Sequence, residues 1–129
     1  MSPFPVVRVT GTIGRRGSRL RRLTVSAPDG ATVLVRCRGK GRSCPFGRLS
    51  RVVKSGKTAA GRAPAAEVVR VRKFERRLLR AGTIVKIFVT KPGVIGKYTR
   101  FKIRAAQPPR RSDRCLMPAS TRPVNCPSS

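Results

Sequence analysis

The sequence has no histidine and no tryptophan, and only four of its 129 residues are acidic. Without histidine, the chain lacks the side chain that most often serves as a general acid or base near neutral pH. The four carboxylates, Asp29, Glu67, Glu75 and Asp113, are scattered among cations that favour their ionised form. The means for acid–base catalysis are therefore poor, and we expect a protein that is not an enzyme and that uses no cofactor.

Long apolar stretches are also missing. No run approaches the roughly 20 residues of a membrane-spanning helix, so no membrane span is expected. The opening residues, MSPFPVVRV, lack the apolar core of a signal peptide, so the chain is expected to be either a cytosolic protein or the mature domain of a secreted one. Aromatic residues make up only 5%, which leaves Val, Ile and Leu to form the core of a single domain and favours strands.

What is abundant is positive charge: 31 Lys and Arg residues give a formal net charge of +27. Such a charge attracts polyanions and opposes compaction by self-repulsion. A nucleic acid, an anionic cell-wall polymer and an anionic membrane surface are all suitable partners. The alternative is that the cations only keep the outer faces of the strands in contact with water and have no dedicated partner.

Apolar and polar residues alternate with the two-residue period of half-buried strands along most of the chain. The segment 83–90 carries apolar side chains on both faces, which is typical of a central strand. Regularly spaced short strands predict an all-β sandwich of about seven strands. The expected strands are 6–13, 22–27, 32–37, 45–53, 67–74, 83–90 and 98–105.

The segments between and after these strands have turn and loop composition. Residues 54–66 are expected to form an exposed loop rich in Gly, Ala and Lys, and 75–82 a brief helical or irregular corner. Prolines recur from position 108 to position 127 and oppose regular structure. We therefore expect a sandwich domain over 1–106 and a proline-rich coil over 107–129, packed on it or tethered to it and tied by its own cysteines.

The stretch from Cys37 to Cys44, CRGKGRSC, has three interpretations: half of a zinc site, a phosphate cradle, or a disulfide-closed loop. In zinc sites the paired cysteines are separated by two to four residues. Here six residues separate Cys37 from Cys44 and ten separate Cys115 from Cys126, which argues against zinc. The glycines lack the third member of a dinucleotide-binding loop. Disulfides need only Cα atoms about 5.5 Å apart. We favour the two local pairs, although crossed pairings stay open.

A second phosphate-loop candidate is the GKT at 56–58. A nucleotide-binding loop needs glycine five positions before Gly56, where Arg51 stands, and Gly61 and Pro64 oppose the helix that should follow. Coil is the better interpretation of this segment.

Nucleic-acid binding is the main rival to an extracellular role. GKYTRFKIR, residues 96–104, interleaves Tyr98 and Phe101 with cations as a base-stacking platform would. In a strand, however, these two side chains face opposite ways, so we expect Phe101 in the core and Tyr98 at the sandwich edge. The alternative for Tyr98 is that it stacks alone on a base. For contact with polyanions we predict an outward row and its neighbours: Arg100, Lys102 and Arg104 with Arg70, Arg72 and Lys86.

Two stretches suggest a family: LTVSAPDGATVLVRCRGKGRSCP at 23–45 and LRAGTIVKIFVTKPGVIGKYTRFKIRAAQPPRRSDRCLMP at 79–118. Together they resemble an arginine-rich, cysteine-containing module found near the C-terminus of predicted secreted proteins of high-GC Gram-positive bacteria. The second stretch is also similar to the end of bacterial immunoglobulin-like domains. The resemblance implies an immunoglobulin-like β-sandwich outside the cell and brings no activity with it. The chain departs from classical immunoglobulin domains in lacking tryptophan and an evident cysteine pair between sheets.

These observations predict a non-enzymatic extracellular or cell-surface module, structural or adhesive, whose basic faces bind an anionic cell-wall polymer or another polyanion. The alternative is a cytosolic nucleic-acid-binding or ribosome-associated basic protein. The cysteines distinguish the two, because Cys37, Cys44, Cys115 and Cys126 form disulfides in the first and stay free thiols in the second. Neither interpretation assigns an oligomeric state.

Overall fold

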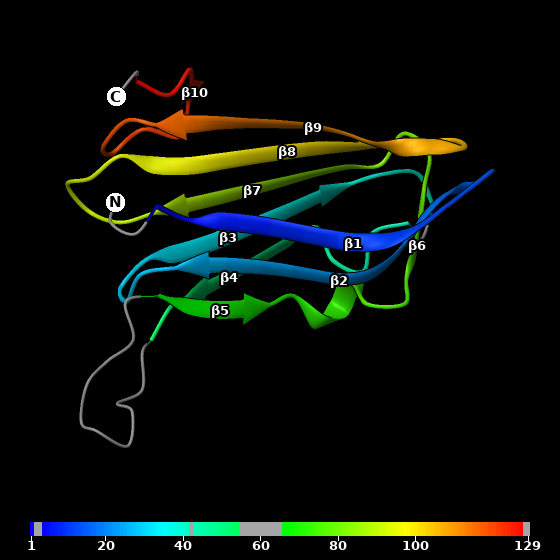
Figure 1. Cartoon of the computed structure of the whole chain (residues 1–129), viewed down its shortest axis with the longest axis horizontal. Helices are drawn as coiled ribbons and strands as arrows, with labels where there is room; N and C mark the ends of the chain where they lie inside the picture. Colours follow the sequence, from blue (N-terminus) through cyan, green and yellow to red (C-terminus); the bar gives the residue numbers. More distant parts are fainter. Residues whose placement is uncertain (2–3, 42, 55–65, 128–129) are drawn as a thin grey trace.

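The computed structural model describes residues 1, 4–41, 43–54 and 66–127. These residues form an all-β sandwich of two sheets, as the sequence predicts, with ten strands in place of about seven (Figure 1). Most of the expected loop at 54–66, with the GKT at 56–58, lies outside the described residues. The strands are β1 (Val6–Gly14), β2 (Gly17–Ala27), β3 (Thr32–Arg38), β4 (Arg48–Val52), β5 (Glu67–Arg70), β6 (Leu78–Arg80), β7 (Ile84–Thr90), β8 (Gly96–Arg104), β9 (Gln107–Leu116) and β10 (Pro123–Val124).

All pairings between strands are antiparallel. The four-stranded sheet has the order β1-β2-β5, with β6 paired to the other end of β2, and the six-stranded sheet has the order β10-β9-β8-β7-β3-β4. The turn at 28–30, PDG, carries the chain from β2 in one sheet to β3 in the other. A short 3-10 helix, η1 (Arg72–Phe74), joins β5 to the corner before β6.

The core lies between the inner faces of the sheets and is built mainly from branched aliphatic side chains. In β7, Val85, Ile87 and Val89 point inward and are fully buried, while the alternate residues are half-buried on the outer face. Its position between β3 and β8 confirms the prediction of a central strand. Phe74 of η1 and Phe101 of β8 complete the core, each with no exposed surface.

The prediction of coil from residue 107 is wrong over Gln107–Leu116, which form β9. Pro108 and Pro109 stand together opposite the single residue Ile103, in a β-bulge of the β8–β9 ladder. Both backbone groups of Ile103 face the segment before β7, where its N–H donates to Thr83 O and its carbonyl accepts from Gly82 N–H. Prolines are tolerated in a bulge because they cannot donate to a ladder that is already interrupted there.

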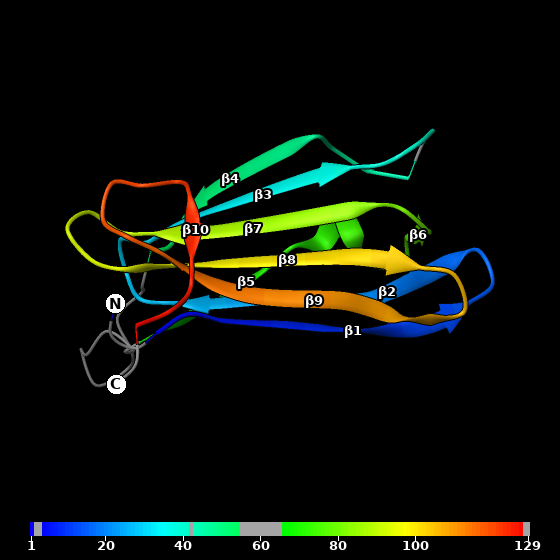
Figure 2. The ribbon, with the colours of Figure 1, turned by 90° about the horizontal axis from the view of Figure 1, so that it is seen from above.

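Residues 117–127 fold back over the outer face of the six-stranded sheet, and β10 pairs with the end of β9 (Figure 2). This segment ends at the disulfide of Cys115 and Cys126. Leu116 is fully buried and Tyr98 is only 6% exposed, although both point to the outer face. The tail is therefore part of the folded unit and covers apolar side chains.

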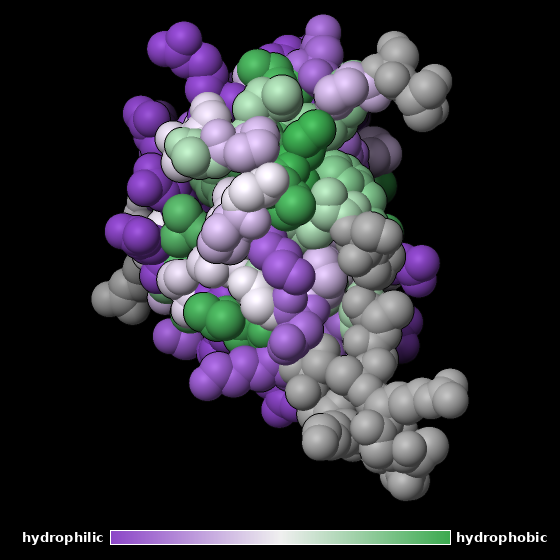
Figure 3. Space-filling view, turned by 90° about the vertical axis from the view of Figure 1, so that its left-hand side faces the viewer, coloured by the Kyte–Doolittle hydropathy of each residue, from purple (hydrophilic) through white to green (hydrophobic). Residues whose placement is uncertain are grey.

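Several large apolar side chains stay exposed at the end of the sandwich where both chain termini lie. Phe4 and Val6 at the start of β1 are 40% and 41% exposed, and Met117 just after β9 is 45% exposed. Figure 3 shows this end, where green apolar atoms alternate with white and lilac ones inside a purple hydrophilic margin.

Candidate polyanion-binding face

The four cysteines form two local disulfides, Cys37 with Cys44 and Cys115 with Cys126, which are the pairs that the sequence analysis favours. Their Cα atoms lie 5.7 Å and 4.8 Å apart, within the usual range for a disulfide. The first closes the loop that follows β3, and the second closes the loop that contains β10. The described residues contain no free cysteine.

The loop closed by Cys37 and Cys44 is anchored through Ser43, which is 2% exposed. The hydroxyl groups of Ser43 and Thr83 lie 2.5 Å apart, and the backbone N–H of Arg80 donates to Ser43 Oγ at 3.0 Å. Arg77 Nε donates to Ser43 O at 3.2 Å. The loop is thus fixed to the corner between β6 and β7.

Two cations of this loop, Arg38 and Lys40, are exposed, and Arg42 lies outside the described residues.

A line of cations crosses the outer face of the six-stranded sheet. Arg36 of β3 pairs with Arg48 of β4 on one side and with Lys86 of β7 on the other, and Lys86 pairs with Arg100 of β8. Neighbouring strands lie about 4.8 Å apart, so these four residues, which we call the cationic row, span about 14 Å. Four positive charges therefore stand directly opposite one another on four adjacent strands.

The same face carries further cations beside the cationic row. Lys102 pairs with Arg110 across β8 and β9, and Arg114 pairs with Tyr98. We call the whole surface the cationic face; its members are Arg36, Arg38, Arg48, Lys86, Arg100, Lys102, Arg110 and Arg114.

None of the four acids lies on the cationic face. Glu67 and Glu75 belong to the side of the four-stranded sheet, and Asp29 is in the turn after β2. Asp113 of β9 points to the inner side, where it accepts a hydrogen bond from Thr99 at 2.7 Å. The ion pairs found among the described residues involve no member of the cationic face.

The structure brings together only part of the predicted set. Lys86, Arg100 and Lys102 lie on the cationic face, and Arg104 at the end of β8 donates Nε to Pro108 O at 2.8 Å. The prediction that Arg70 and Arg72 are neighbours of these residues is wrong, because β5 and η1 lie on the side of the other sheet.

Arg70 is instead engaged with an acid. Its Nε and Nη2 atoms donate to the two carboxylate oxygens of Glu75. These hydrogen bonds hold the pKa of Glu75 below its ordinary value. The guanidinium is thus already paired with an anion of its own chain.

Sequence reasoning missed the other members of the cationic face for two reasons. Alternation in 32–37 already pointed Arg36 outward, but its position beside Lys86 depends on which strands pair. Arg110 and Arg114 were not predicted because residues 107–116 were expected to be coil. β9 has almost no apolar alternation that would indicate a strand.

The aromatic residues of β8 do not form a stacking platform. Phe101 is buried in the core as expected, and Tyr98 packs on Phe88 with ring centroids 5.1 Å apart. Burial raises the pKa of Tyr98, and the nearby charges of Arg100 and Arg114 oppose that rise. No ring of β8 is therefore open to a nucleic-acid base.

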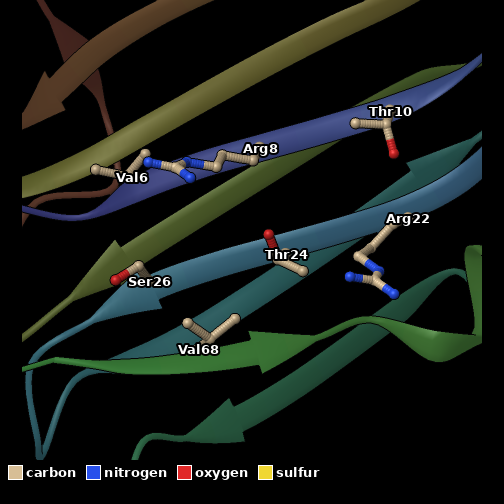
Figure 4. A pocket seen from close by; sticks show the side chains of 7 residues that line it. All are labelled: Val6, Arg8, Thr10, Arg22, Thr24, Ser26 and Val68. Atoms are coloured by element: carbon tan, nitrogen blue, oxygen red, sulfur yellow. The ribbon is translucent and has the colours of Figure 1, made fainter.

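The outer face of the four-stranded sheet differs in character. It holds a shallow groove of about 450 Å³ with small polar side chains between two exposed valines, Val6 and Val68. Two cations border it: Arg8 lies along β1 and Arg22 extends from β2 toward β5 (Figure 4). The paired strands of this sheet set no two cations directly opposite each other. Arg8 and Arg70 both stand opposite Thr24, and Arg22 stands opposite Thr10.

The comparisons with known proteins leave the function to be argued from the chain itself. No protein-family model, curated protein or solved structure matches the chain. No helix in the described part is long and apolar enough to cross a membrane. Within the described ranges, no three potential ligands among His, Cys, Asp and Glu are grouped to hold a metal ion.

Proposed function

We propose that the chain is a non-enzymatic extracellular or cell-surface module that holds anionic polymers against its cationic face. The observation that carries the proposal is the cationic row. Like charges directly opposite each other on neighbouring strands destabilise a sheet. A bound polyanion relieves that repulsion, so the arrangement favours the bound state over the free one.

The two disulfides support an extracellular setting, because such bonds form and persist in oxidising compartments. The resemblance to secreted modules of high-GC Gram-positive bacteria supports the same setting. Protein taken from its native compartment and alkylated without reductant should keep the mass of the unmodified disulfide form. Four added alkyl groups would contradict the extracellular part of the proposal.

The cationic face also attracts nucleic-acid phosphates, but its described residues include no row of open aromatic rings on which successive bases would stack. Tyr98 is only 6% exposed, so base stacking is confined to the open part of the Phe88 ring. Binding to DNA is expected to be weak, independent of sequence and strongly dependent on salt. We therefore favour an anionic wall polymer over a nucleic acid as the partner.

The test compares two double variants that remove the same charge from opposite faces. Lys86→Gln with Arg100→Gln changes the cationic row, and Arg8→Gln with Arg22→Gln changes the groove on the other sheet. Binding to polygalacturonate, to a glycerol-phosphate polymer and to a DNA duplex is measured over a range of salt concentrations. We expect the row variant to bind about tenfold more weakly, with a salt slope shallower by about 1.5, which is roughly 0.7–0.9 per lost contact. Equal losses in the two variants would contradict a dedicated face.

A further inference from the structure

A pocket of about 260 Å³ lies on the outer face of the six-stranded sheet, at the end of the cationic row. Two of its lining residues, Arg36 and Arg48, belong to that row. The others are apolar or carry hydroxyl groups. The lining is Thr32, Leu34, Arg36, Arg48, Ser50, Phe88, Thr90 and Thr121.

The middle of the pocket is apolar. Leu34 of β3 stands directly opposite Phe88 of β7 on one side and Ser50 of β4 on the other. Phe88 packs on Tyr98 with an interplanar angle of 59°, and Tyr98 is itself only 6% exposed. The Tyr98 ring therefore fixes one side of the Phe88 ring, while part of the Phe88 surface remains open to the pocket.

Polar groups stand on both sides of this apolar centre. Thr32 and Thr90 form one cross-strand pair, and Arg36 and Arg48 form the other. Positions 32 and 36 of β3 are about 13 Å apart at 3.3 Å per residue. Hydroxyl groups thus lie at one end of the pocket and two guanidinium groups at the other.

The last part of the lining comes from the far end of the chain. Thr121 lies in the segment that folds back over the sheet between β9 and β10, which the disulfide of Cys115 and Cys126 closes. The pocket is therefore assembled from β3, β4, β7 and the tail. Because it depends on strand pairing and on the folded tail, the completed lining exists only in the native fold.

We infer that this pocket binds one ring of an acidic glycan. The apolar C–H face of the sugar lies on Leu34 and Phe88, and the hydroxyls of Thr32, Ser50, Thr90 and Thr121 meet those of the sugar. The acid group of the sugar lies against Arg36 and Arg48, whose planar guanidinium groups match a carboxylate or phosphate in two-point contacts. The inference rests on the proposed function and names the class of polyanion.

Competing polyanions fit this lining less well. A polyphosphate chain has no apolar surface to cover Leu34 and Phe88, so it gains only the charge contacts. A pocket of about 260 Å³ is smaller than the roughly 300–1,000 Å³ of sites for drug-sized ligands, so it admits one ring at a time. Neighbouring units of the polymer then continue along the cationic row toward Lys86 and Arg100.

The experiment compares two linear anions of equal charge, an oligogalacturonate and a polyphosphate, by calorimetry on the full chain. We expect the oligogalacturonate to bind about tenfold more tightly. The double variant Ser50→Ala with Thr121→Ala removes two exposed hydroxyl groups and leaves the charge unchanged. It should weaken oligogalacturonate binding about tenfold, since one hydrogen bond contributes roughly three- to tenfold, and leave polyphosphate binding unchanged.

The matched control is Ser112→Ala, an exposed serine opposite Arg100 and outside the pocket. Its affinity for both polymers should equal that of the wild type. Amide NMR shifts should move at Leu34, Phe88 and Thr90 with oligogalacturonate and not with polyphosphate. Equal affinity for the two polymers, or equal effects of the pocket and control variants, would overturn the sugar-ring inference alone. If neither polymer binds the wild type, the proposed function is wrong as well.

Discussion

Lys86 and Arg100 occupy directly opposite positions on β7 and β8, and Arg36 flanks Lys86 on its other side. A like-charged cross-strand neighbour is unfavourable, whereas an opposite charge contributes roughly 0.2–1 kcal/mol. The described residues provide no acid to relieve this contact. An acidic residue at position 86 would therefore favour folding, whereas polyanion binding is favoured by the cation that stands there.

Lys86→Glu should raise the free energy of unfolding and weaken polyanion binding at once. A carboxylate between Arg36 and Arg100 converts two repulsive neighbours into attractive ones, with a gain of about 1 kcal/mol at low salt. Urea unfolding at low and high salt measures the gain, and Lys86→Gln separates the loss of repulsion from the added attraction. Unchanged stability in both variants would mean that solvent already screens the row.

Tyr98 should titrate at a higher pH in the folded protein than in the unfolded one. Burial raises its pKa above the ordinary value near 10, against the charges of Arg100 and Arg114. Because it is the only tyrosine and the chain has no tryptophan, ultraviolet absorbance reports this residue alone. Alkaline titration with and without urea should show the midpoint fall on unfolding. Identical midpoints would mean that the Tyr98 ring is open to solvent in the folded protein.

The strands that form the core could be predicted from the sequence because the alternation of apolar and polar residues directly indicates which side chains are buried. Val85, Ile87 and Val89 mark the inner face of β7 without any knowledge of its neighbours. β9 escaped prediction because a strand that is solvent-exposed over most of its length needs no apolar alternation, and its prolines lie in a bulge that no local pattern indicates.

The candidate site could be predicted only in part. An outward position follows from alternation, so Lys86, Arg100 and Lys102 were found. Which cations stand side by side follows from strand order, and Arg36 lies 50 residues from Lys86 in the chain. Arg70 was wrongly placed beside them because β5 belongs to the other sheet, which alternation does not reveal.

Ser43→Ala should destabilise the protein although it removes a single oxygen atom. The hydroxyl of Thr83 and the backbone N–H of Arg80 would each lose their partner in a buried setting. Leaving a buried polar group unsatisfied costs roughly 1–3 kcal/mol. Urea unfolding should show this loss, whereas Ser50→Ala on exposed β4 should change stability by less than about 0.5 kcal/mol. Equal effects of the two substitutions would show that the loop is not anchored through Ser43.

Asp113 should make stability depend on pH in the acid range. Burial raises its pKa, but hydrogen bonds from Arg111 and Thr99 outweigh that effect and hold the pKa below its ordinary value. Arg111 also donates from Nη2 to Val7 O of β1, so the carboxylate orients a side chain that joins the two sheets. Because the folded pKa is lowered, the stabilisation is complete above the unfolded pKa near 3.9 and is lost as pH falls through the folded pKa.

The unfolding temperature of the wild type should therefore decrease when the pH is lowered below about 4. Asp113→Asn should make the unfolding temperature depend less on pH in this range. Glu75→Gln is the matched control, because Glu75 also has a lowered pKa but pairs with Arg70 on one side of the molecule and joins no sheets. We expect Asp113→Asn to lower the unfolding temperature at pH 7 more than Glu75→Gln does. If the two variants lower the unfolding temperature equally, the hydrogen bond from Arg111 to Val7 O does not depend on Asp113.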